Sequence, residues 1–453
     1  MRRFVLSATL VLYSLFSFAE NPCAQPHARA LVMSGGGSKG AFEAGAIYHL
    51  VIQRGCDFSE ISGTSVGALN GALLAQAPVN SDPAISQANF VKQVDAMITM
   101  WTSIKGTKEI VRGRPLATLR FGLFGLEGMK NFTPLRKLVN DNVSLERLDI
   151  GRELRVGTVT FHDGSYREIV MNAKGRTDTK AKDYIFGSAI IPMFGVMPRV
   201  AVQNAKSVEQ VQFADGSIRH AVPADSYFVQ CSWNREGLLS PADCRNSGNH
   251  GIPPHPRVEQ LFIILTNPYE RDREFKSVYS NAAFKPGTRQ MTDGRKIMTR
   301  SIDIIMDTVQ HMDLDSMLLA NDLLTWRAED ISNDPGRRFP VESYNYDAQR
   351  PELPGLGYDI AMIIPRREDA DMLNFSPERV ATQLYCGCLA ADETMRTQFG
   401  LESKEAGCTE KFRPASKSKG AKAPAEFPAG VCVNTPAMME AAKQSATTDE
   451  NGK

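Results

Sequence analysis

Two glycine-rich turns near the start of this 453-residue chain carry residue types that suit acyl transfer. Residues 35–40 read GGGSKG, and residues 63–67 read GTSVG. In the first turn, successive backbone N–H groups can converge on a negatively charged oxygen. The second turn has the G-x-S-x-G pattern, which presents a serine hydroxyl where a strand passes into a helix. Together the two turns predict an oxyanion hole next to a nucleophile.

Ser65 is the predicted nucleophile of the second turn. Gly63 and Gly67 remove the Cβ atoms that would crowd so tight a turn, and the following helix N-terminus favours a negative charge nearby. A serine in this position can also act only as a helix N-cap. Because Ser62 and Thr64 can serve equally well as caps, we assign Ser65 to catalysis.

The first turn has three interpretations. A dinucleotide-binding turn requires an acidic residue at the end of the second strand, but Asp57, at the right separation, comes at the start of that strand. A phosphate-binding P-loop requires Lys-Ser/Thr, and Ala41 follows Gly40 instead. The third interpretation, an oxyanion hole, is favoured over these and over a plain turn. Lys39 is then a loop-bracing or solvated cation or, less favoured, a contact for a lipid phosphate. The residues assigned to the hole are Gly35, Gly36, Gly37, Lys39 and Gly40.

The base that would activate Ser65 is less clearly marked. In an α/β-hydrolase the serine follows several strands and precedes an acid and a histidine, whereas Ser65 follows only the second strand. His220 is the best histidine candidate, which leaves a Ser–His–Asp esterase open. Of three Asp-Gly pairs, Asp163-Gly164 is typical of a hairpin turn and Asp293-Gly294 has no strand before it. Asp215 follows an apolar segment, so the pattern modestly favours it as the base of a Ser–Asp dyad.

The elements that must position these residues begin with a strand–helix–strand–helix pattern at 28–34, 41–54, 58–62 and 68–76, which predicts a parallel sheet covered by helices. An apolar, glycine-rich segment at 116–129 is either a lid or membrane contact, or an ordinary core segment. From about Gly400 the composition predicts no fixed structure. The further predicted strands are 154–161, 166–171, 211–214, 261–266 and 360–364, and the further helices are 89–104, 134–139, 184–191, 301–327 and 377–395.

Residues 1–19 have the layout of a secretory signal peptide, with two arginines, an apolar run and small residues before a cleavage point after Ala19. We therefore expect export to the periplasm or out of the cell, with an uncleaved membrane anchor as the alternative. All eight cysteines lie beyond this segment, and disulfides are predicted for Cys23 with Cys56 and, second, for Cys231 with Cys244. Metal binding is the weaker interpretation of the cysteines. The formal net charge of +1 argues against a nucleic-acid partner.

The two turns and the Asp215-Gly216 pair resemble the motifs of the patatin-like phospholipases, and the resemblance spans residues 28–395. Ser188-Ala189, Pro192 and Phe194 resemble the family's approach to its Asp-Gly motif, and 374–379 resembles the closing helix of bacterial members. Ser217 and His220 depart from the family pattern, and 228–257 is interpreted as an insertion.

The resemblance implies a three-layer α/β/α fold with a mainly parallel central sheet. It also implies a lipid acyl hydrolase of the phospholipase A or lysophospholipase type, working through an acyl-serine without a metal or cofactor. The expected substrate is a phospholipid or another acyl ester, met at a membrane surface that the enzyme contacts peripherally. Residues 396–453 are interpreted as a flexible C-terminal extension.

Overall fold

The computed structural model describes residues 21–24, 28–114, 128–172, 177–203, 208–224, 227, 258–269, 308–319, 321, 359–366, 372–412, 427 and 431–432. The predicted signal peptide, the 228–257 insertion, Cys231, Cys244 and Asp293 lie outside the described residues. So do most of the apolar segment 116–129 and most of the helix predicted at 301–327. No helix in the described part of the chain is both long and apolar enough to span a bilayer.

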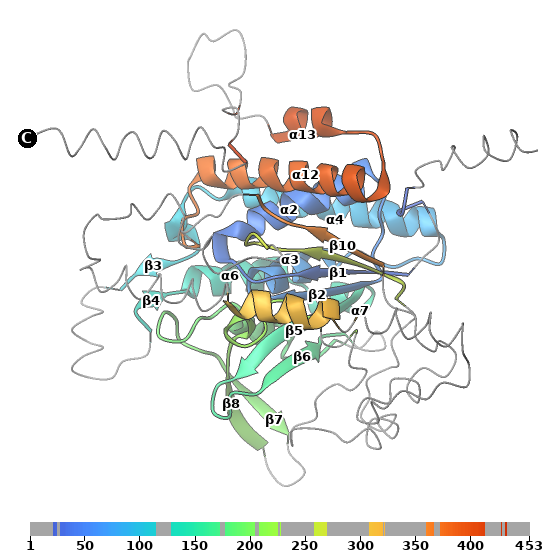
Figure 1. Cartoon of the computed structure of the whole chain (residues 1–453). Coiled ribbons are helices and arrows are strands. Elements are labelled where there is room, and N and C mark those ends of the chain that lie inside the picture. The colour runs from blue at the N-terminus through green and yellow to red at the C-terminus, as the bar shows by residue number, and fades with distance from the viewer. Residues whose placement is uncertain are drawn as a thin grey trace, which may run out of the picture.

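A mixed sheet lies at the centre of the protein, with the strand order β10-β9-β1-β2-β5-β8-β7, and β6 pairs with β5 as well (Figure 1). Strands β10, β9, β1, β2 and β5 are parallel to one another, whereas β6 and β8 run antiparallel to β5, and β7 antiparallel to β8. The mainly parallel sheet predicted from the sequence is therefore present. The strands are β1 (Arg29–Met33), β2 (Glu60–Thr64), β5 (Glu153–Thr160), β6 (Tyr166–Val170), β7 (Arg199–Gln203), β8 (Val208–Asp215), β9 (Gln260–Ile264) and β10 (Asp359–Ile363).

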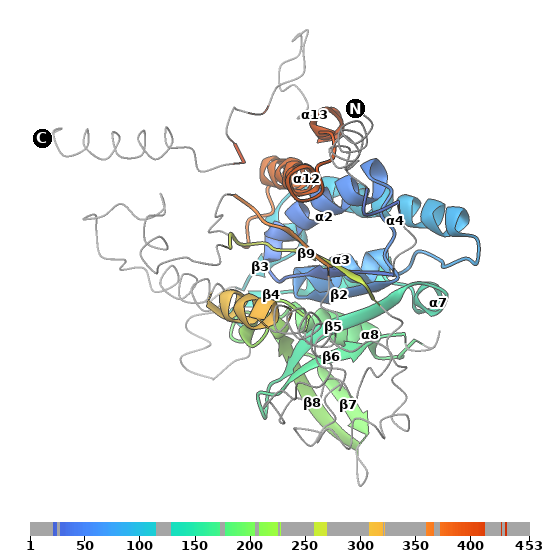
Figure 2. The same cartoon turned by 45° about the vertical axis from the view of Figure 1, so that its right-hand side comes forward.

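Helices flank the sheet and bury its two faces in separate cores. Because side chains alternate along a strand, Leu31 and Met33 of β1 face one core and Ala30 and Val32 face the other. The helix at 308–319 packs on the second core, opposite α2 and α12 (Figures 1 and 2). The helices of the first core are α2 (Gly40–Tyr48), α3 (Val66–Leu74), α4 (Pro83–Ser103), α6 (Thr133–Asn142), α8 (Ala181–Ser188) and α12 (Pro377–Phe399), with α7 (Leu145–Asp149) and α13 (Glu405–Phe412) at its border.

Most elements lie where the sequence predicts them, with ends that are shifted by a few residues. Strand β2 begins at Glu60 instead of Phe58 and continues to Thr64, directly before Ser65. Helix α4 begins six residues earlier than predicted, because Asp82 accepts a hydrogen bond from the Ala84 amide and caps the helix ahead of a proline. Helix α2 continues through a π-helical turn, His49–Gln53, and the chain leaves it at Gly55 with a positive φ of 76°.

The prediction that the chain has no fixed structure beyond Gly400 is wrong for residues 405–412, which form α13. Gly400 ends α12 in the left-handed conformation, and the chain then folds back. A disulfide joins Cys408 of α13 to Cys388 of α12, and a second joins Cys386 to Cys432. Composition alone missed this helix, because its mostly polar sequence is held in place by the disulfide and by a few buried side chains, Cys408 and Phe412.

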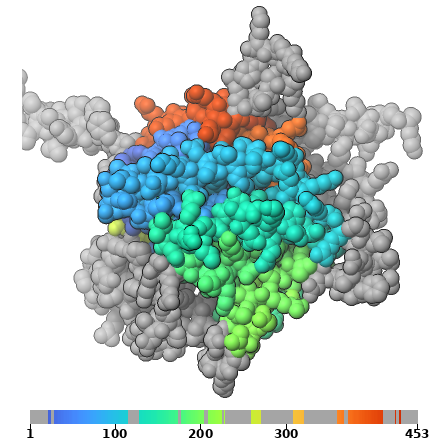
Figure 3. All heavy atoms as spheres, turned by 180° about the vertical axis from the view of Figure 1, so that it is seen from behind, coloured from blue at the N-terminus to red at the C-terminus, as the bar shows by residue number. Residues whose placement is uncertain are grey.

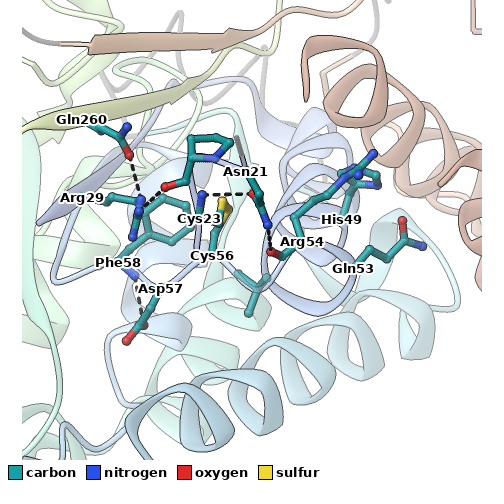
Figure 4. Close-up of a disulfide and its surroundings, with 12 residues drawn as sticks. Asn21, Cys23, Arg29, His49, Gln53, Arg54, Cys56, Asp57, Phe58 and Gln260 are labelled. Carbon is teal, nitrogen blue, oxygen red and sulfur yellow. Dashed lines mark hydrogen bonds between the residues drawn. A yellow bond between two sulfur atoms is a disulfide. The ribbon is translucent and has the colours of Figure 1, made fainter. Parts of the chain in front are cut away.

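The disulfide predicted between Cys23 and Cys56 is confirmed (Figure 4). It fastens the segment before β1 to the start of the connection into β2. Asn21 donates a hydrogen bond to the Arg54 carbonyl, and Arg29 donates one to Pro22 and another, of 2.8 Å, to Gln260. The first described residues are therefore held against the amino-terminal edge of the sheet.

Candidate active site

Ser65 lies in a sharp turn between β2 and α3. Its φ is 56° and its ψ is −121°, a backbone conformation that non-glycine residues rarely adopt. A Cβ on Gly63 would collide with the backbone of Gly67, and a Cβ on Gly67 would collide with the Met33 carbonyl. The two glycines of the motif are therefore required by close approach of neighbouring backbone, and together they hold the serine at the head of α3.

Asp215 is the hydrogen-bond partner of that serine. It is the last residue of β8, and its backbone pairs with Thr158 of β5. The Ser65 hydroxyl donates a hydrogen bond of 2.6 Å to Asp215 Oδ2, while Asp215 Oδ1 accepts one of 2.9 Å from the Ser217 amide. The exposed fraction is 5% for Ser65 and 0% for Asp215. The structure thus brings together the two residues that sequence reasoning selected for catalysis.

Burial sets the acidity of Asp215. Desolvation raises the pKa of its carboxyl group from the ordinary 3.8 to about 6, against the opposing effect of hydrogen bonds from Ser65 and Ser217. At neutral pH the carboxylate is therefore mostly ionised and can take up a proton. A carboxylate with a pKa this close to neutrality is a better proton acceptor than one at 3.8.

Ser188 binds the backbone of the serine turn, at the Ser65 amide. Sequence reasoning did not identify this contact. The Ser188 hydroxyl accepts a hydrogen bond of 2.9 Å from the Ser65 amide and donates one of 2.6 Å to the Gly157 carbonyl. Ser188 is the last residue of α8, and Gly157 lies in β5, next to β2 in the sheet. The resemblance had pointed to Ser188 only as part of the approach to Asp215, with no partner to suggest this role.

The glycine-rich loop at 35–40 lies directly beside Ser65. A Cβ on Gly35 would stand 3.1 Å from the Ser65 Cβ, and Gly37 lines the same pocket as Ser65. Four amides of the loop are already committed to carbonyl oxygens. They are the amides of Gly35 (to Ala221), Ser38 (to Met372), Lys39 (to Gly36) and Gly40 (to Gly37 and Ser38).

The amides of Gly36 and Gly37 differ from those four. Within the described part of the chain, neither donates a hydrogen bond to a protein acceptor. Gly37 has a positive φ of 59°, and its Cα approaches the Met372 carbonyl too closely for any side chain. Of the five residues that the sequence assigned to the hole, these two alone keep backbone donors that a ligand could occupy.

Lys39 braces the loop. Its side chain is buried, and its ammonium group donates a hydrogen bond to the side chain of Asn267. Thr266, the residue before Asn267, donates a hydrogen bond from its hydroxyl to the Gly35 carbonyl. The burial of Lys39 and its contact with Asn267 agree with the loop-bracing position and not with a solvated one.

The residues that would support the alternative interpretations make other contacts. The His220 ring packs against Tyr166 with ring centroids 4.4 Å apart, and its Nδ1 lies 3.1 Å from Asp313 Oδ1. Asp57 forms an ion pair of 2.7 Å with Arg152, at the amino-terminal edge of the parallel strands. Ser65 and the glycine loop lie at the opposite, carboxyl-terminal edge. Asp163 accepts hydrogen bonds from Ser165 in the hairpin turn between β5 and β6, as predicted.

An apolar pocket opens at Ser65 and Asp215. It runs between α3, α4 and α6, and an acyl chain is the chemical group that such a lining suits. Figure 3 shows the outer surface of this part of the molecule, where α4 and the teal segment that contains α6 lie side by side. The apolar side chains lining the pocket include Leu69, Leu73, Met100, Trp101, Ile104, Phe132, Leu135, Leu138, Val139 and Phe375.

Comparison with known proteins agrees with this site. Residues 31–227 match the family described as patatin-like phospholipase, so the chain carries a patatin-like phospholipase domain. Both glycine turns, Ser65 and Asp215 fall within the matched segment. The family supports lipid acyl hydrolase activity on lipid ester substrates. No curated protein matches the chain in sequence.

Two solved structures are similar to this chain. VipD from Legionella pneumophila is 13% identical, with a TM-score of 0.29, and the match covers 82% of this chain and 67% of that one. In the heterodimeric ExoU–SpcU complex from the type III secretion system of Pseudomonas aeruginosa, the matched chain is 17% identical, with a TM-score of 0.23. That match covers 73% of this chain and 58% of the other.

Proposed function

We propose that this protein hydrolyses fatty-acyl esters of phospholipids or lysophospholipids through an acyl-serine intermediate formed on Ser65. The observation that carries the proposal is the 2.6 Å hydrogen bond from the Ser65 hydroxyl to the buried Asp215 carboxylate at the mouth of an apolar pocket. A serine hydroxyl is a weak nucleophile until a base removes its proton. Asp215, with its pKa raised to about 6 by burial, is the group in place to do so.

The chemistry follows from these positions. Ser65 Oγ attacks the ester carbonyl carbon as its proton passes to Asp215, and the resulting oxyanion accepts hydrogen bonds from the Gly36 and Gly37 amides. Collapse of the tetrahedral intermediate breaks the ester bond, and the leaving alcohol takes the proton from Asp215. A water molecule then attacks the acyl-serine and gives a proton to Asp215. When this second tetrahedral intermediate collapses, Ser65 Oγ takes the proton from Asp215 and the fatty acid leaves, which restores both residues.

The test is fluorophosphonate labelling together with turnover of an acyl ester. We expect Ser65→Ala to lose both, and Asp215→Ala to lose turnover by about 100-fold or more, the range of a missing general base. Ser62→Ala is the matched control for the serine, because Ser62 is buried three residues earlier and its hydroxyl donates to the Pro223 carbonyl. Asp163→Ala is the control for the Asp-Gly motif. Labelling that persists in Ser65→Ala would refute the proposal.

A Ser–His–Asp esterase makes a different prediction for His220. If His220 were the base, His220→Ala would be as damaging as Ser65→Ala. The contacts of His220 with Tyr166 and Asp313 favour a structural role. We therefore expect His220→Ala to keep its turnover to within a few-fold of the wild type.

We also propose that the protein is exported and meets its substrate at a membrane surface. The Cys23–Cys56, Cys386–Cys432 and Cys388–Cys408 disulfides support the first part, since disulfides persist in oxidising compartments. The mass of the mature chain tests it, with cleavage after Ala19 expected and an intact first segment as the contrary result. Sedimentation with phospholipid vesicles tests the second part, with protein that stays in the supernatant as the contrary result.

A further inference from the structure

Asn70 of α3 makes three side-chain hydrogen bonds under the glycine loop. Its amide nitrogen donates to the Gly40 carbonyl at 2.9 Å and to Glu43 Oε2 at 2.8 Å. Its carbonyl oxygen accepts a hydrogen bond of 2.8 Å from the indole nitrogen of Trp101. The side chain is fully buried, and both of its amide hydrogens have an acceptor.

These three bonds join the parts of the site that must keep a fixed separation. Gly40 ends the glycine loop and begins α2, Trp101 belongs to α4, and Asn70 itself lies on the helix that Ser65 heads. Gly40 is enclosed so closely that a Cβ there would collide with Val66, the residue after the nucleophile, and with Trp101. The loop end is therefore held between the serine turn and α4, and Asn70 supplies the polar contacts that fix it.

Glu43, which accepts one of the Asn70 hydrogen bonds, is an acidic residue in a position where apolar residues are usual. It is fully buried, and desolvation raises the pKa of its carboxyl group well above the usual range. In the described residues no cation pairs with it, and its Oε1 has no hydrogen-bond partner. Burial therefore disfavours a negative charge on Glu43, and its Oε2 accepts the Asn70 hydrogen bond. A negative charge close to the glycine loop would oppose an oxyanion bound by its amides.

We propose that Asn70 is a positioning residue of the acyl transfer, holding the Gly36 and Gly37 amides at the distance from Ser65 that the oxyanion requires. This inference rests on the proposed function. Hydrogen-bond donors stabilise an oxyanion only when they are held within a few tenths of an ångström of the right place. Loss of the Asn70 bond to Gly40 loosens the loop end relative to α3, and the loss falls on the transition state more than on substrate binding.

Asn70→Asp keeps the side-chain shape and the acceptor for Trp101 but replaces the amide donor to Gly40 and Glu43 with a carboxyl oxygen. Asn172→Asp is a matched control. Asn172 is also a buried asparagine with three bonds, donating to the Leu148 and Arg152 carbonyls and accepting from the Leu154 amide. It lies at the amino-terminal end of β5, the edge of the sheet opposite to Ser65.

We expect Asn70→Asp to lower kcat by about 10- to 100-fold with little change in KM, part of what a lost oxyanion donor costs. The rate of fluorophosphonate labelling should fall in parallel. Asn172→Asp should lower the melting temperature comparably and leave kcat within a few-fold of the wild type. A kcat for Asn70→Asp equal to that of Asn172→Asp, or a loss expressed wholly in KM, overturns the inference.

One further variant keeps the test decisive if Asn70→Asp does not fold. Trp101→Phe keeps an aromatic ring but removes the indole donor to Asn70, and we expect a smaller fall in kcat with KM little changed. This variant adds no carboxyl group, so a fall in its kcat cannot come from an added charge. An unchanged kcat in Trp101→Phe contradicts the positioning role.

Ser65→Ala in the same assays separates this inference from the proposed function. Turnover that survives Ser65→Ala refutes the function itself. An inactive Ser65→Ala with a fully active Asn70→Asp refutes the positioning role alone.

Discussion

The raised pKa of Asp215 predicts how kcat/KM depends on pH. Only the ionised carboxylate can accept the Ser65 proton, so activity should follow the ionised fraction of this one group. With a pKa of about 6, that fraction is about 9% at about pH 5 and about 91% at about pH 7. We therefore expect kcat/KM to rise about tenfold between these two pH values.

An unperturbed carboxyl group gives a different profile. At the ordinary value of 3.8, Asp215 would be about 94% ionised already at about pH 5, and kcat/KM would be nearly flat from there upward. The size of the rise thus measures the effect of burial on this site. The direction is fixed as well, because activity falls towards acid pH as the base becomes protonated.

The assay is release of fatty acid from a short-chain ester, quenched and quantified directly so that the detected product does not titrate. Circular dichroism at each pH separates loss of catalysis from loss of the fold. The Ser62→Ala variant serves as control and should reproduce the wild-type profile. A flat profile between about pH 5 and pH 8, with the fold intact, would contradict the assignment of a buried Asp215 as the base.

The remaining predictions concern stability and substrate choice. The pKa of Asp215 is higher in the folded than in the unfolded state, so ionisation of this group lowers the free energy of unfolding. This loss of stability is absent below about pH 3.8 and complete above about pH 6. Asp215→Asn should therefore raise the free energy of unfolding at about pH 8 by up to about 3 kcal/mol while it abolishes turnover, and a loss of stability in denaturant melts would contradict this. Gly63→Ala should lower that free energy by about 2–4 kcal/mol, because its Cβ collides with the Gly67 backbone; an unchanged urea midpoint would refute the account of the serine turn. Leu73→Trp, which fills the apolar pocket two turns of α3 away from Ser65, should shift the ratio of kcat/KM values for long and short acyl chains about tenfold towards short ones. An unaltered ratio would show that the acyl chain binds elsewhere.

The position of Ser65 and its surroundings could be predicted from the sequence because their signals are local. The G-x-S-x-G pattern around Ser65 needs only residues within one turn, and backbone close approach explains both of its glycines. The strand–helix alternation before it also comes from short-range periodicity. The sequence also pointed to Asp215, because it is the one of three Asp-Gly pairs that follows an apolar strand.

What the sequence could not provide are contacts between segments far apart in the chain. Which amides of the glycine loop remain available depends on Ala221 and Met372, whose carbonyls occupy the Gly35 and Ser38 amides. The bond from the Ser65 amide to Ser188 spans more than a hundred residues. Helix α13 depends on a cysteine pairing, and such pairings cannot be deduced from spacing alone.

The segment that matches the family, residues 31–227, does not contain everything that holds the site. Strand β9, which pairs with β1 along its whole length, and β10 beside it both lie beyond residue 227. Met372 accepts the Ser38 amide, and α12 packs on α2 so closely that a Cβ on Gly45 or Gly387 would collide with the other helix.

Two features of the site are unfavourable in themselves. The positive φ of Ser65 stores strain of about 1–3 kcal/mol, and the Asp215 carboxyl group is fully buried, so burial disfavours its ionised form. Such features persist only where the surrounding structure over-determines them. Here the constraints come from segments before and after residue 227 in the sequence. Ser188, before it, holds the serine turn. Thr266, Asn267 and Met372, after it, hold the glycine loop. The candidate site therefore depends on segments on both sides of residue 227, and the segment that matches the family carries Ser65 and Asp215 but not all of the contacts that hold them.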